Sequence, residues 1–383
     1  MIYLDNAATS LPKPPHVYSV MDEFFRHRAA NPGRAGYRLS VESEREVEVA
    51  RKLVADLFGA REPERIVFTL NATDAINMAL KGLLKEKDHV ITSNLEHNSV
   101  TRPLYGLEKR GLISVTTVEA SREGVLDPES IERAINSQTR LIVITHAPNV
   151  LGTIQPVRDI GRVARDREIL FMVDAAQSAG VWPIDVEKDF LDLMAFTGHK
   201  GLFGPPGTGG LYVGERVPKI LPWREGGTGT DSESPTHPEE FPFALEGGTP
   251  NFVGIVGLKA GLEFIAERGI DEIRRHGQQL LRKILNDVEG DDRFVLYGPR
   301  LHKQETEDRL PIVPLNIKGL EPSVAGGILD QTYGIAVRSG LHCAPLTHKG
   351  MGSFPHGALR VSPGYFNTED DIVQLTNALK EIA

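Results

Sequence analysis

The feature that most constrains the fold is an alternation of short apolar runs with longer amphipathic segments, which begins near residue 65. The apolar runs are strand-sized and lie at 65–69, 90–93, 141–145, 169–173 and 193–196. They are continuous rather than alternating with polar residues, which is typical of strands buried on both faces. Helical patterns such as 74–84 lie between most of them. The pattern therefore predicts an α/β fold with a mostly parallel sheet.

The remainder of the chain has a different organisation. A segment rich in Gly, Pro, Ser and Thr at 226–250 reads as a long loop, and two helices are predicted after it, at 253–268 and 270–288. Short strands (309–317, 334–338, 358–362) then mix with helices (323–331, 368–382), which is an α+β pattern. We expect a large domain at 15–255, a small C-terminal domain at 256–383, and an N-terminal segment, 1–14, packed with the small domain.

Charge and composition exclude several classes of function. Lys and Arg total 43 against 52 Asp and Glu, so the net charge is −9, which disfavours a broad nucleic-acid surface. No apolar window is long enough for a membrane helix, and the N-terminus lacks a secretory pattern. The single cysteine, Cys343, excludes an intramolecular disulfide and a cysteine-based zinc site. We expect a cytoplasmic protein with no metal site, no nucleic-acid partner and no membrane partner.

Two strand ends carry the clearest chemical signal. Asp174 ends the run at 169–173, and Lys200 follows 26 residues later, just past the next strand. A carboxylate and a lysine buried together are costly unless both have partners. Pyridoxal 5'-phosphate (PLP) supplies both, since its ring nitrogen pairs with an Asp and its aldehyde with a Lys. The simpler alternative is a structural ion pair at a loop mouth.

Other polar residues also follow strand ends. Residues 71–74 open a helix whose free N–H groups suit a phosphate, although plain N-capping by Thr73 explains the same pattern. His97 follows the strand at 90–93 and could stack on a planar ring, and Asn149 follows the strand at 141–145. Because ligand sites in open α/β sheets collect at the carboxyl ends of strands, we expect these groups to share one site.

Motifs spread over nearly the whole chain resemble the class V aminotransferases of PLP fold type I, and within them the cysteine desulfurases and selenocysteine lyases. The matching segments are an opening motif at 3–9, the lysine motif at 198–200, an interface loop at 246–251, the cysteine motif at 338–344, and a C-terminal signature at 359–362 and 365–369. The resemblance implies a large domain with a mostly parallel seven-stranded sheet and a small α+β domain.

The resemblance also implies roles at the cofactor. Lys200 would form the Schiff base with PLP and then move protons, Asp174 would pair with the ring nitrogen, and His97 would stack on the ring. Gln177 and Asn149 would contact the phenolic oxygen. The phosphate would be held by Ala72, Thr73, Thr197 and His199, and by Thr249 of the neighbouring subunit, which makes the family an obligate homodimer.

For the substrate, the resemblance implies that Arg360 holds the carboxylate of L-cysteine, with Asn149 beside it, since a guanidinium suits bidentate binding. The Cys343 thiolate would attack the substrate sulfur, release L-alanine, and pass its persulfide to a sulfur acceptor, for which a protein is one candidate. The chain departs from the common pattern with Leu341 and Asn98 in place of histidines.

Three alternatives remain at the level of sequence. The first is a selenocysteine lyase, and the second is a class V aminotransferase or β-lyase acting on another amino acid, in which Cys343 only packs. The third is a binding scaffold that has lost catalysis, against which the intact Lys200 and Asp174 argue.

Overall fold

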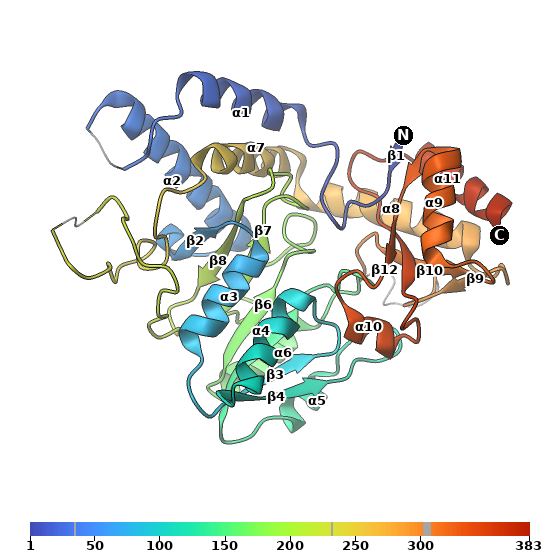
Figure 1. Cartoon of the computed structure of the whole chain (residues 1–383), viewed down its shortest axis with the longest axis horizontal. Helices are drawn as coiled ribbons and strands as arrows, with labels where there is room; N and C mark the ends of the chain where they lie inside the picture. Colours follow the sequence, from blue (N-terminus) through green and yellow to red (C-terminus); the bar gives the residue numbers. More distant parts are fainter. Residues whose placement is uncertain (34–35, 231–232, 302–307) are drawn as a thin grey trace.

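The computed structural model describes residues 1–33, 36–230, 233–301 and 308–383. Its larger part is built on a seven-stranded sheet, and its smaller part on a four-stranded sheet (Figure 1). In the large sheet the strand order is β2-β8-β7-β6-β5-β3-β4, and only β8 runs antiparallel to its neighbours. The predicted mostly parallel α/β sheet is therefore confirmed. The strands are β2 (Ile66–Thr69), β3 (Asp88–Ser93), β4 (Ile113–Val118), β5 (Thr139–Thr145), β6 (Leu170–Asp174), β7 (Leu193–Thr197) and β8 (Gly209–Val213).

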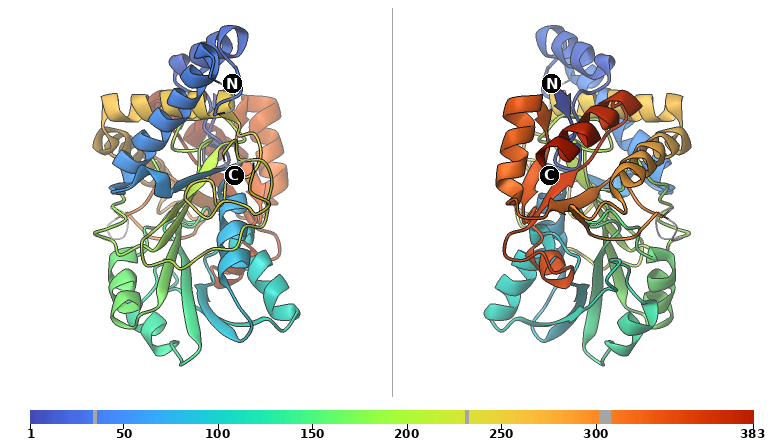
Figure 2. Two further views of the ribbon diagram at one scale, coloured as in Figure 1. Left: turned by 90° about the vertical axis from the view of Figure 1, so that its left-hand side faces the viewer. Right: turned by 90° about the vertical axis from the view of Figure 1, so that its right-hand side faces the viewer.

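Helices cover both faces of this sheet, and the left view of Figure 2 shows the strands between them. Side chains alternate between the two faces along each strand: in β5, Ile142 and Ile144 pack on one face and Leu141 and Val143 on the other. The first face is covered by α2 (Arg38–Phe58), α5 (Pro128–Arg133), α6 (Val157–Asp166) and α7 (Phe252–Arg268), and the second by α3 (Ala72–Leu83) and α4 (Asn98–Lys109). Burial on both faces explains why the strands read as continuous apolar runs.

Two strands of the large sheet escaped prediction. The edge strand β4 has no continuous apolar run, because only its first and last residues are buried. The interior strand β8 begins with Gly209 and Gly210, a residue type depleted in strands. A Cβ at Gly210 would lie 2.3 Å from the ring of Phe196 on β7, so close packing of the two strands requires glycine there. The segment from 214 to 251, apart from 231–232, forms no helix or strand, as predicted for the long loop.

The smaller part has its own sheet, with strand order β12-β13-β10-β9. Its apolar core is separate from the two cores of the large sheet. The predicted strand at 309–317 begins only at residue 313, and the strand at 334–338 is divided into two short strands. The elements are α8 (Ile270–Val288), β9 (Phe294–Leu296), β10 (Val313–Ile317), α9 (Pro322–Tyr333), β11 (Ile335–Ala336), β12 (Arg338–Gly340), α10 (Pro345–Gly350), β13 (Ala358–Val361) and α11 (Glu369–Ile382).

The N-terminal segment joins the smaller part before the chain enters the larger one. Strand β1 (Ile2–Tyr3) pairs in parallel with β11, and Leu4 lies in the core of the smaller part (Figure 1). Helix α1 (Pro15–His27) then packs against α7. The buried side chains of α7 belong to the core of the large sheet. We therefore propose a domain boundary at Gly269, between α7 and α8, rather than near residue 256.

None of the helices in the described residues combines the length and the apolar character that crossing a bilayer requires.

Candidate active site

The carboxyl ends of the large-sheet strands converge on one pocket, where the sequence predicted a site. Asp174 is the last residue of β6, and Lys200 lies in the turn that follows β7. The smaller part and the N-terminal segment close the pocket from the opposite side. Its lining comprises residues 7, 8, 71–73, 97, 99, 145, 147, 149, 174, 176, 177, 197, 199, 200, 338 and 360.

Lys200 and Asp174 both shift toward their neutral forms. The pKa of the Lys200 amine is lowered to about 8, mainly by burial and partly by the charges of Arg360 and Arg338, while the charge of Asp174 acts in the opposite direction. Burial raises the pKa of the Asp174 carboxyl, which accepts a 2.9 Å hydrogen bond from the Ala176 N–H. Among the described residues, Lys200 Nζ makes no hydrogen bond. A lysine in this state is a better nucleophile than an exposed one.

His97 presents a neutral imidazole to the pocket. It is the N-cap of α4, and its Nδ1 accepts a 3.1 Å hydrogen bond from the Ser99 N–H. The ring proton therefore sits on Nε2. Burial lowers the pKa of His97 to about 4, and the charge of Lys200 contributes. The Ser99 hydroxyl lies 2.6 Å from the Thr73 hydroxyl, which ties the starts of α3 and α4 together.

The start of α3 offers an anion site. The N-cap is Asn71, whose Oδ1 accepts a 2.9 Å bond from the Asp74 N–H, so the simple alternative of capping by Thr73 is wrong. Within the described chain, the N–H groups of Ala72 and Thr73 have no backbone or side-chain acceptor. The Thr197 hydroxyl is also buried at this pocket without a partner. Free donors at a helix N-terminus fit a phosphate group.

These features fit the PLP implied by the sequence. A carboxylate, a partly neutral lysine, a flat imidazole and an unsatisfied phosphate cup line one pocket. No residue among them requires a different cofactor. In the parts of the chain that the structure describes, no cluster of three His, Cys, Asp or Glu residues is arranged to hold a metal ion.

Arg360 enters the pocket from β13, fully buried. Its Nη2 donates to Asp5 Oδ1 at 2.6 Å, and its Nη1 donates to the Asn149 carbonyl at 2.9 Å. Its Nε has no partner in the described structure. A guanidinium held at two corners with one donor free is oriented in advance for an anionic ligand.

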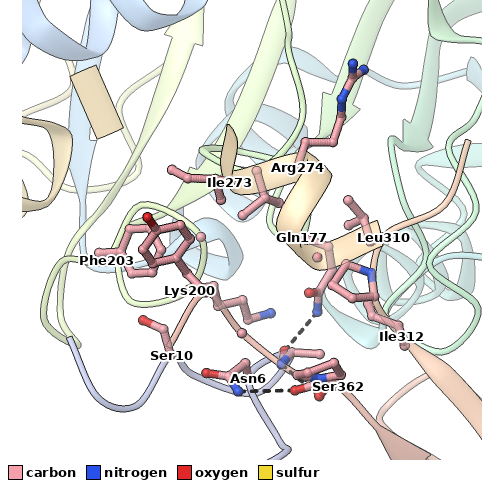
Figure 3. Close-up of a pocket in the computed structure, with 18 of the residues that line it drawn as sticks. Asn6, Ser10, Gln177, Lys200, Phe203, Ile273, Arg274, Leu310, Ile312 and Ser362 are labelled. Carbon is pink, nitrogen blue, oxygen red and sulfur yellow. Dashed lines mark hydrogen bonds between the residues drawn. The ribbon is translucent and has the colours of Figure 1, made fainter. Parts of the chain in front are cut away.

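Gln177 and Lys200 also line a second, largely apolar pocket between the two parts of the chain, which Figure 3 shows. The Gln177 side-chain amide donates a 2.9 Å hydrogen bond to the carbonyl of Ala7 in the N-terminal segment. Nearby, Asn6 Nδ2 donates to the Ser362 carbonyl at 3.2 Å. The N-terminal segment therefore forms part of the wall between the two pockets.

Cys343 lies at the mouth of the site, on a strained turn. His342 and Cys343 both have left-handed backbone conformations, with φ of 51° and 58°. A chain of hydrogen bonds fixes this turn: the Ser353 hydroxyl donates to His348, His348 Nε2 to His342 Nδ1 at 3.2 Å, and His342 Nε2 to the Arg338 carbonyl at 3.3 Å. The carbonyl oxygen can only accept, so every tautomer in the chain is determined.

The Cys343 thiol is exposed, and Arg338 Nη2 lies 3.8 Å from its sulfur. The Cys343 carbonyl accepts a 2.8 Å bond from the Asn98 N–H, at the first residue of α4. Arg338 therefore lies against the sulfur, and the start of α4 anchors the backbone of Cys343. Cys343 lines a neighbouring groove, which shares Thr73, His97 and Ser99 with the Lys200 pocket.

The structure brings together most of the predicted site residues. The lining of the Lys200 pocket includes Ala72, Thr73, His97, Asn149, Asp174, Gln177, Thr197, His199, Lys200 and Arg360. Cys343 lies in the adjoining groove, and Thr249 lies away from both, on a surface next to β2. Sequence reasoning missed Ser99, Arg338 and Asp5. Arg338 stands inside the quoted cysteine motif, but Asp5 becomes relevant only through its contact with Arg360.

Comparisons with known proteins agree with this geometry. The family model described as aminotransferase class-V matches residues 2–375. A probable cysteine desulfurase from Methanothermobacter thermautotrophicus is 40% identical over all of this chain and 94% of its own length. A cysteine desulfurase from Escherichia coli O157:H7 is 33% identical over all of this chain and 93% of its own. The solved apo structure of a cysteine desulfurase from Thermococcus onnurineus superposes with a TM-score of 0.91 at 34% identity, covering all of this chain and 94% of that one.

Proposed function

Since the chain belongs to the class-V aminotransferase family, we propose that it is a PLP-dependent cysteine desulfurase. It converts L-cysteine to L-alanine and keeps the sulfur as a persulfide on Cys343, from which an acceptor removes it. The observation that carries this proposal is the position of Cys343. The only thiol of the chain lies in a groove that shares three residues with the Lys200 pocket. The names of the relatives support the same substrate.

Bound PLP would supply an electron sink at the amino-acid substrate. The chain's own residues have separate tasks around it. Asp174 would hold a proton at the ring nitrogen, and its burial would keep water away from this interaction. The Lys200 amine, with its pKa near 8, both accepts and returns protons close to neutral pH. His97 would cover the ring with a neutral imidazole, so that it adds no positive charge to the site.

The phosphate would lie at the start of α3. The free N–H groups of Ala72 and Thr73 face it, together with the unpartnered hydroxyl of Thr197. His199 lies beside them in the pocket lining. The two N–H donors are fixed by backbone geometry, so they need no rearrangement on binding.

Arg360 holds the substrate carboxylate. Arg360 lines the pocket and its Nε has no partner in the described structure, while the contacts with Asp5 and Asn149 fix the plane of the guanidinium. Binding of a carboxylate here adds a second anion to a buried cation that already has one. The substrate therefore competes in part with Asp5 for Arg360.

Sulfur leaves the substrate at Cys343. The Cys343 thiolate forms a bond to the substrate sulfur while the substrate's carbon–sulfur bond breaks, and the bonding electrons stay with the carbon fragment. Protonation of that fragment gives L-alanine, and a persulfide remains on Cys343. Arg338, 3.8 Å from Sγ, stabilises the negative charge that the sulfur carries before and after this step. A free thiol in this role requires a reducing compartment, such as the cytoplasm.

We further propose that the active unit is a homodimer in which Thr249 reaches the partner's phosphate. Thr249 does not line the Lys200 pocket of its own chain. Its loop is anchored firmly: Glu246 accepts hydrogen bonds from Arg51 Nη1 at 2.7 Å, from Arg51 Nη2 at 3.1 Å and from the Phe68 N–H at 2.6 Å. A rigid loop that presents a threonine outward suits a contribution to a second copy.

The assay that tests the proposal measures alanine and sulfide released from L-cysteine in the presence of dithiothreitol. We expect Cys343→Ala to abolish both products while leaving PLP binding and its visible spectrum unchanged, because Cys343 lies outside the Lys200 pocket. Alkylation after incubation with cysteine should trap one extra sulfur on the Cys343 peptide of the wild-type enzyme.

The control is Lys200→Ala, which should lose all turnover and the lysine adduct that borohydride traps. Wild-type turnover of L-cysteine by Cys343→Ala would overturn the desulfurase assignment and favour a general lyase or aminotransferase. Turnover of L-selenocysteine alone, with none of L-cysteine, would instead identify a selenocysteine lyase.

A further inference from the structure

The carbonyl oxygen of His199 accepts four hydrogen bonds from residues 9–13 of the N-terminal segment. The donors are the Thr9 hydroxyl at 3.0 Å, the Ser10 N–H at 3.0 Å, the Ser10 hydroxyl at 3.2 Å and Lys13 Nζ at 3.2 Å. Figure 3 shows Ser10 beside the turn that carries Lys200. Because this oxygen belongs to the peptide bond between His199 and Lys200, the contacts act directly on the backbone that carries the Lys200 amine.

Lys13 is a buried cation that forms no ion pair within the described ranges. It is 9% exposed, and its Nζ also donates to the Ser10 carbonyl at 3.1 Å and to the Ser10 hydroxyl at 3.0 Å. These three donated bonds need the three N–H groups of an ammonium, since a neutral amine has only two. Burial lowers the pKa of Lys13 to about 8, so its amine is still mostly charged at pH 7.

The charge of Lys13 gives it a particular effect on His199. Burying a charge without an anion costs free energy, and an apolar side chain could fill the same space without that cost. A charged donor, however, binds a carbonyl more strongly than a neutral donor does. Since the Ser10 hydroxyl accepts a bond from Lys13, its own proton is left to point at the His199 oxygen. Lys13 therefore holds this oxygen both directly and through Ser10.

We propose that Lys13 is a positioning residue for Lys200. By holding the peptide bond that precedes Lys200, it fixes the direction in which the catalytic amine enters the pocket and keeps that amine out of water. This inference rests on the proposed function, because it assigns Lys200 the catalytic task described above. Lys13 does not line the Lys200 pocket, so it acts only through the turn.

The other end of the N-terminal segment is fixed in the smaller part of the chain. The Asn6 N–H donates to the Ser362 carbonyl at 2.9 Å, and the Ser362 N–H donates to the Leu4 carbonyl at 2.7 Å. Between these residues, Asp5 accepts the hydrogen bond from Arg360. A segment anchored beside the substrate's carboxylate site therefore reaches the backbone of the catalytic lysine, and Lys13 is the last contact of this connection.

The test measures the Lys200 amine in the PLP-free protein. Lys13→Met keeps most of the apolar stem of the side chain and removes the charged donor. Competitive labelling with acetic anhydride over a range of pH gives the midpoint at which Lys200 becomes reactive, near pH 8 in the wild type. We expect the midpoint to rise by about one pH unit in Lys13→Met, because a released turn lets water reach the amine. Reconstitution with PLP should slow in parallel.

Tyr18→Phe is the matched control. The Tyr18 hydroxyl accepts a 2.9 Å hydrogen bond from the Lys13 N–H, so this variant loosens the same segment without removing a donor to His199. It should keep the wild-type midpoint. An equal shift in Tyr18→Phe and Lys13→Met would overturn the proposal, because general loosening of the segment would then explain both. A wild-type midpoint and a wild-type rate of reconstitution in Lys13→Met would also overturn it and leave Lys13 a structural residue.

Ser10→Ala tests whether the two side chains act on one oxygen. Because Lys13 orients the Ser10 hydroxyl, the midpoint shift of the double variant should be smaller than the sum of the two single shifts. Additive shifts would show that Lys13 and Ser10 act separately and would contradict the proposed arrangement.

Steady-state kinetics with L-cysteine separate this proposal from the proposed function. Lys13→Met should lower kcat roughly tenfold and change KM little, since Lys200 is displaced while Arg360 keeps its contacts. A rise in KM with unchanged kcat would contradict a role at Lys200. If the wild type forms no alanine from cysteine, the desulfurase assignment fails, and the labelling midpoints still decide whether Lys13 positions Lys200.

Discussion

The Lys200 amine provides the sharpest test of the site's electrostatics. Its pKa of about 8, against the ordinary 10.5, results mainly from burial. At pH 7 about a tenth of such amines are neutral, against about 0.03% of ordinary lysines, a difference of about 300-fold. Only the neutral amine attacks an aldehyde or another electrophile. We therefore expect Lys200 to react far faster near neutral pH than a lysine in water does.

The perturbation is pH, and the assay is competitive labelling of the PLP-free protein with a small amount of acetic anhydride. Free Nα-acetyl-lysine in the same tube is the internal standard, and peptide mass spectrometry gives the extent of reaction at Lys200. Between about pH 6 and pH 11, the reactivity of Lys200 should rise to a plateau with its midpoint near pH 8, while the standard continues to rise. The rate of reconstitution with PLP should show the same midpoint.

The charge of Asp174 predicts in which direction the pKa of Lys200 moves when this carboxylate is removed. Because Asp174 raises the pKa of Lys200 against the effect of burial, Asp174→Asn should move the midpoint below that of the wild type. A wild-type midpoint near 10.5 would show that water reaches the amine freely and would refute the burial argument. A midpoint that rises in Asp174→Asn would show that the carboxylate does not face Lys200.

Two further changes test contacts that hold the site together. Glu246→Ala removes the carboxylate that binds both terminal nitrogens of the buried Arg51 and leaves only Glu48, 3.1 Å from Arg51 Nε. We expect a loss of up to about 3–5 kcal/mol, which a chain of 383 residues registers in thermal scanning as roughly 5 °C. Arg51→Met with Glu246→Leu should recover most of this loss, and equal losses in both variants would contradict the ion-pair account. Asp5→Asn removes the negative charge that competes for Arg360 but keeps an oxygen that can accept the same hydrogen bond, so it should lower the KM for L-cysteine several-fold with little change in kcat. An increase in KM would show that the charge of Asp5 contributes more to orienting Arg360 than to competing with the substrate.

The sequence alone was sufficient for the parts of this protein that depend on local burial. Continuous apolar runs predicted the strands β2, β3, β5, β6 and β7, and the helix at 270–288 begins and ends where the pattern predicted. The same reasoning placed Asp174 and Lys200 at neighbouring strand ends. These predictions were possible because the pattern of buried and exposed positions is visible in consecutive residues. The site could be placed because the carboxyl ends of parallel strands lie at the same edge of a sheet.

The motif resemblance also predicted the individual residues of the pocket, but it did not predict the contacts among them. No property of Asp5 or of Arg360 taken separately predicts their ion pair, which joins residues 355 positions apart. In the same way, Gln177 contacts the N-terminal segment, and Arg338 lies beside the Cys343 sulfur across a strained turn.

Only the tertiary structure decided these features, because they arise where separately folded elements meet. Strand β8 exists as an interior strand because its glycines fit against Phe196, a constraint that no local pattern expresses. The groove beside Cys343 forms because α3 and α4 start at one pocket. Local sequence sets which segments form and which of their faces are buried, whereas packing sets which charges end up facing each other.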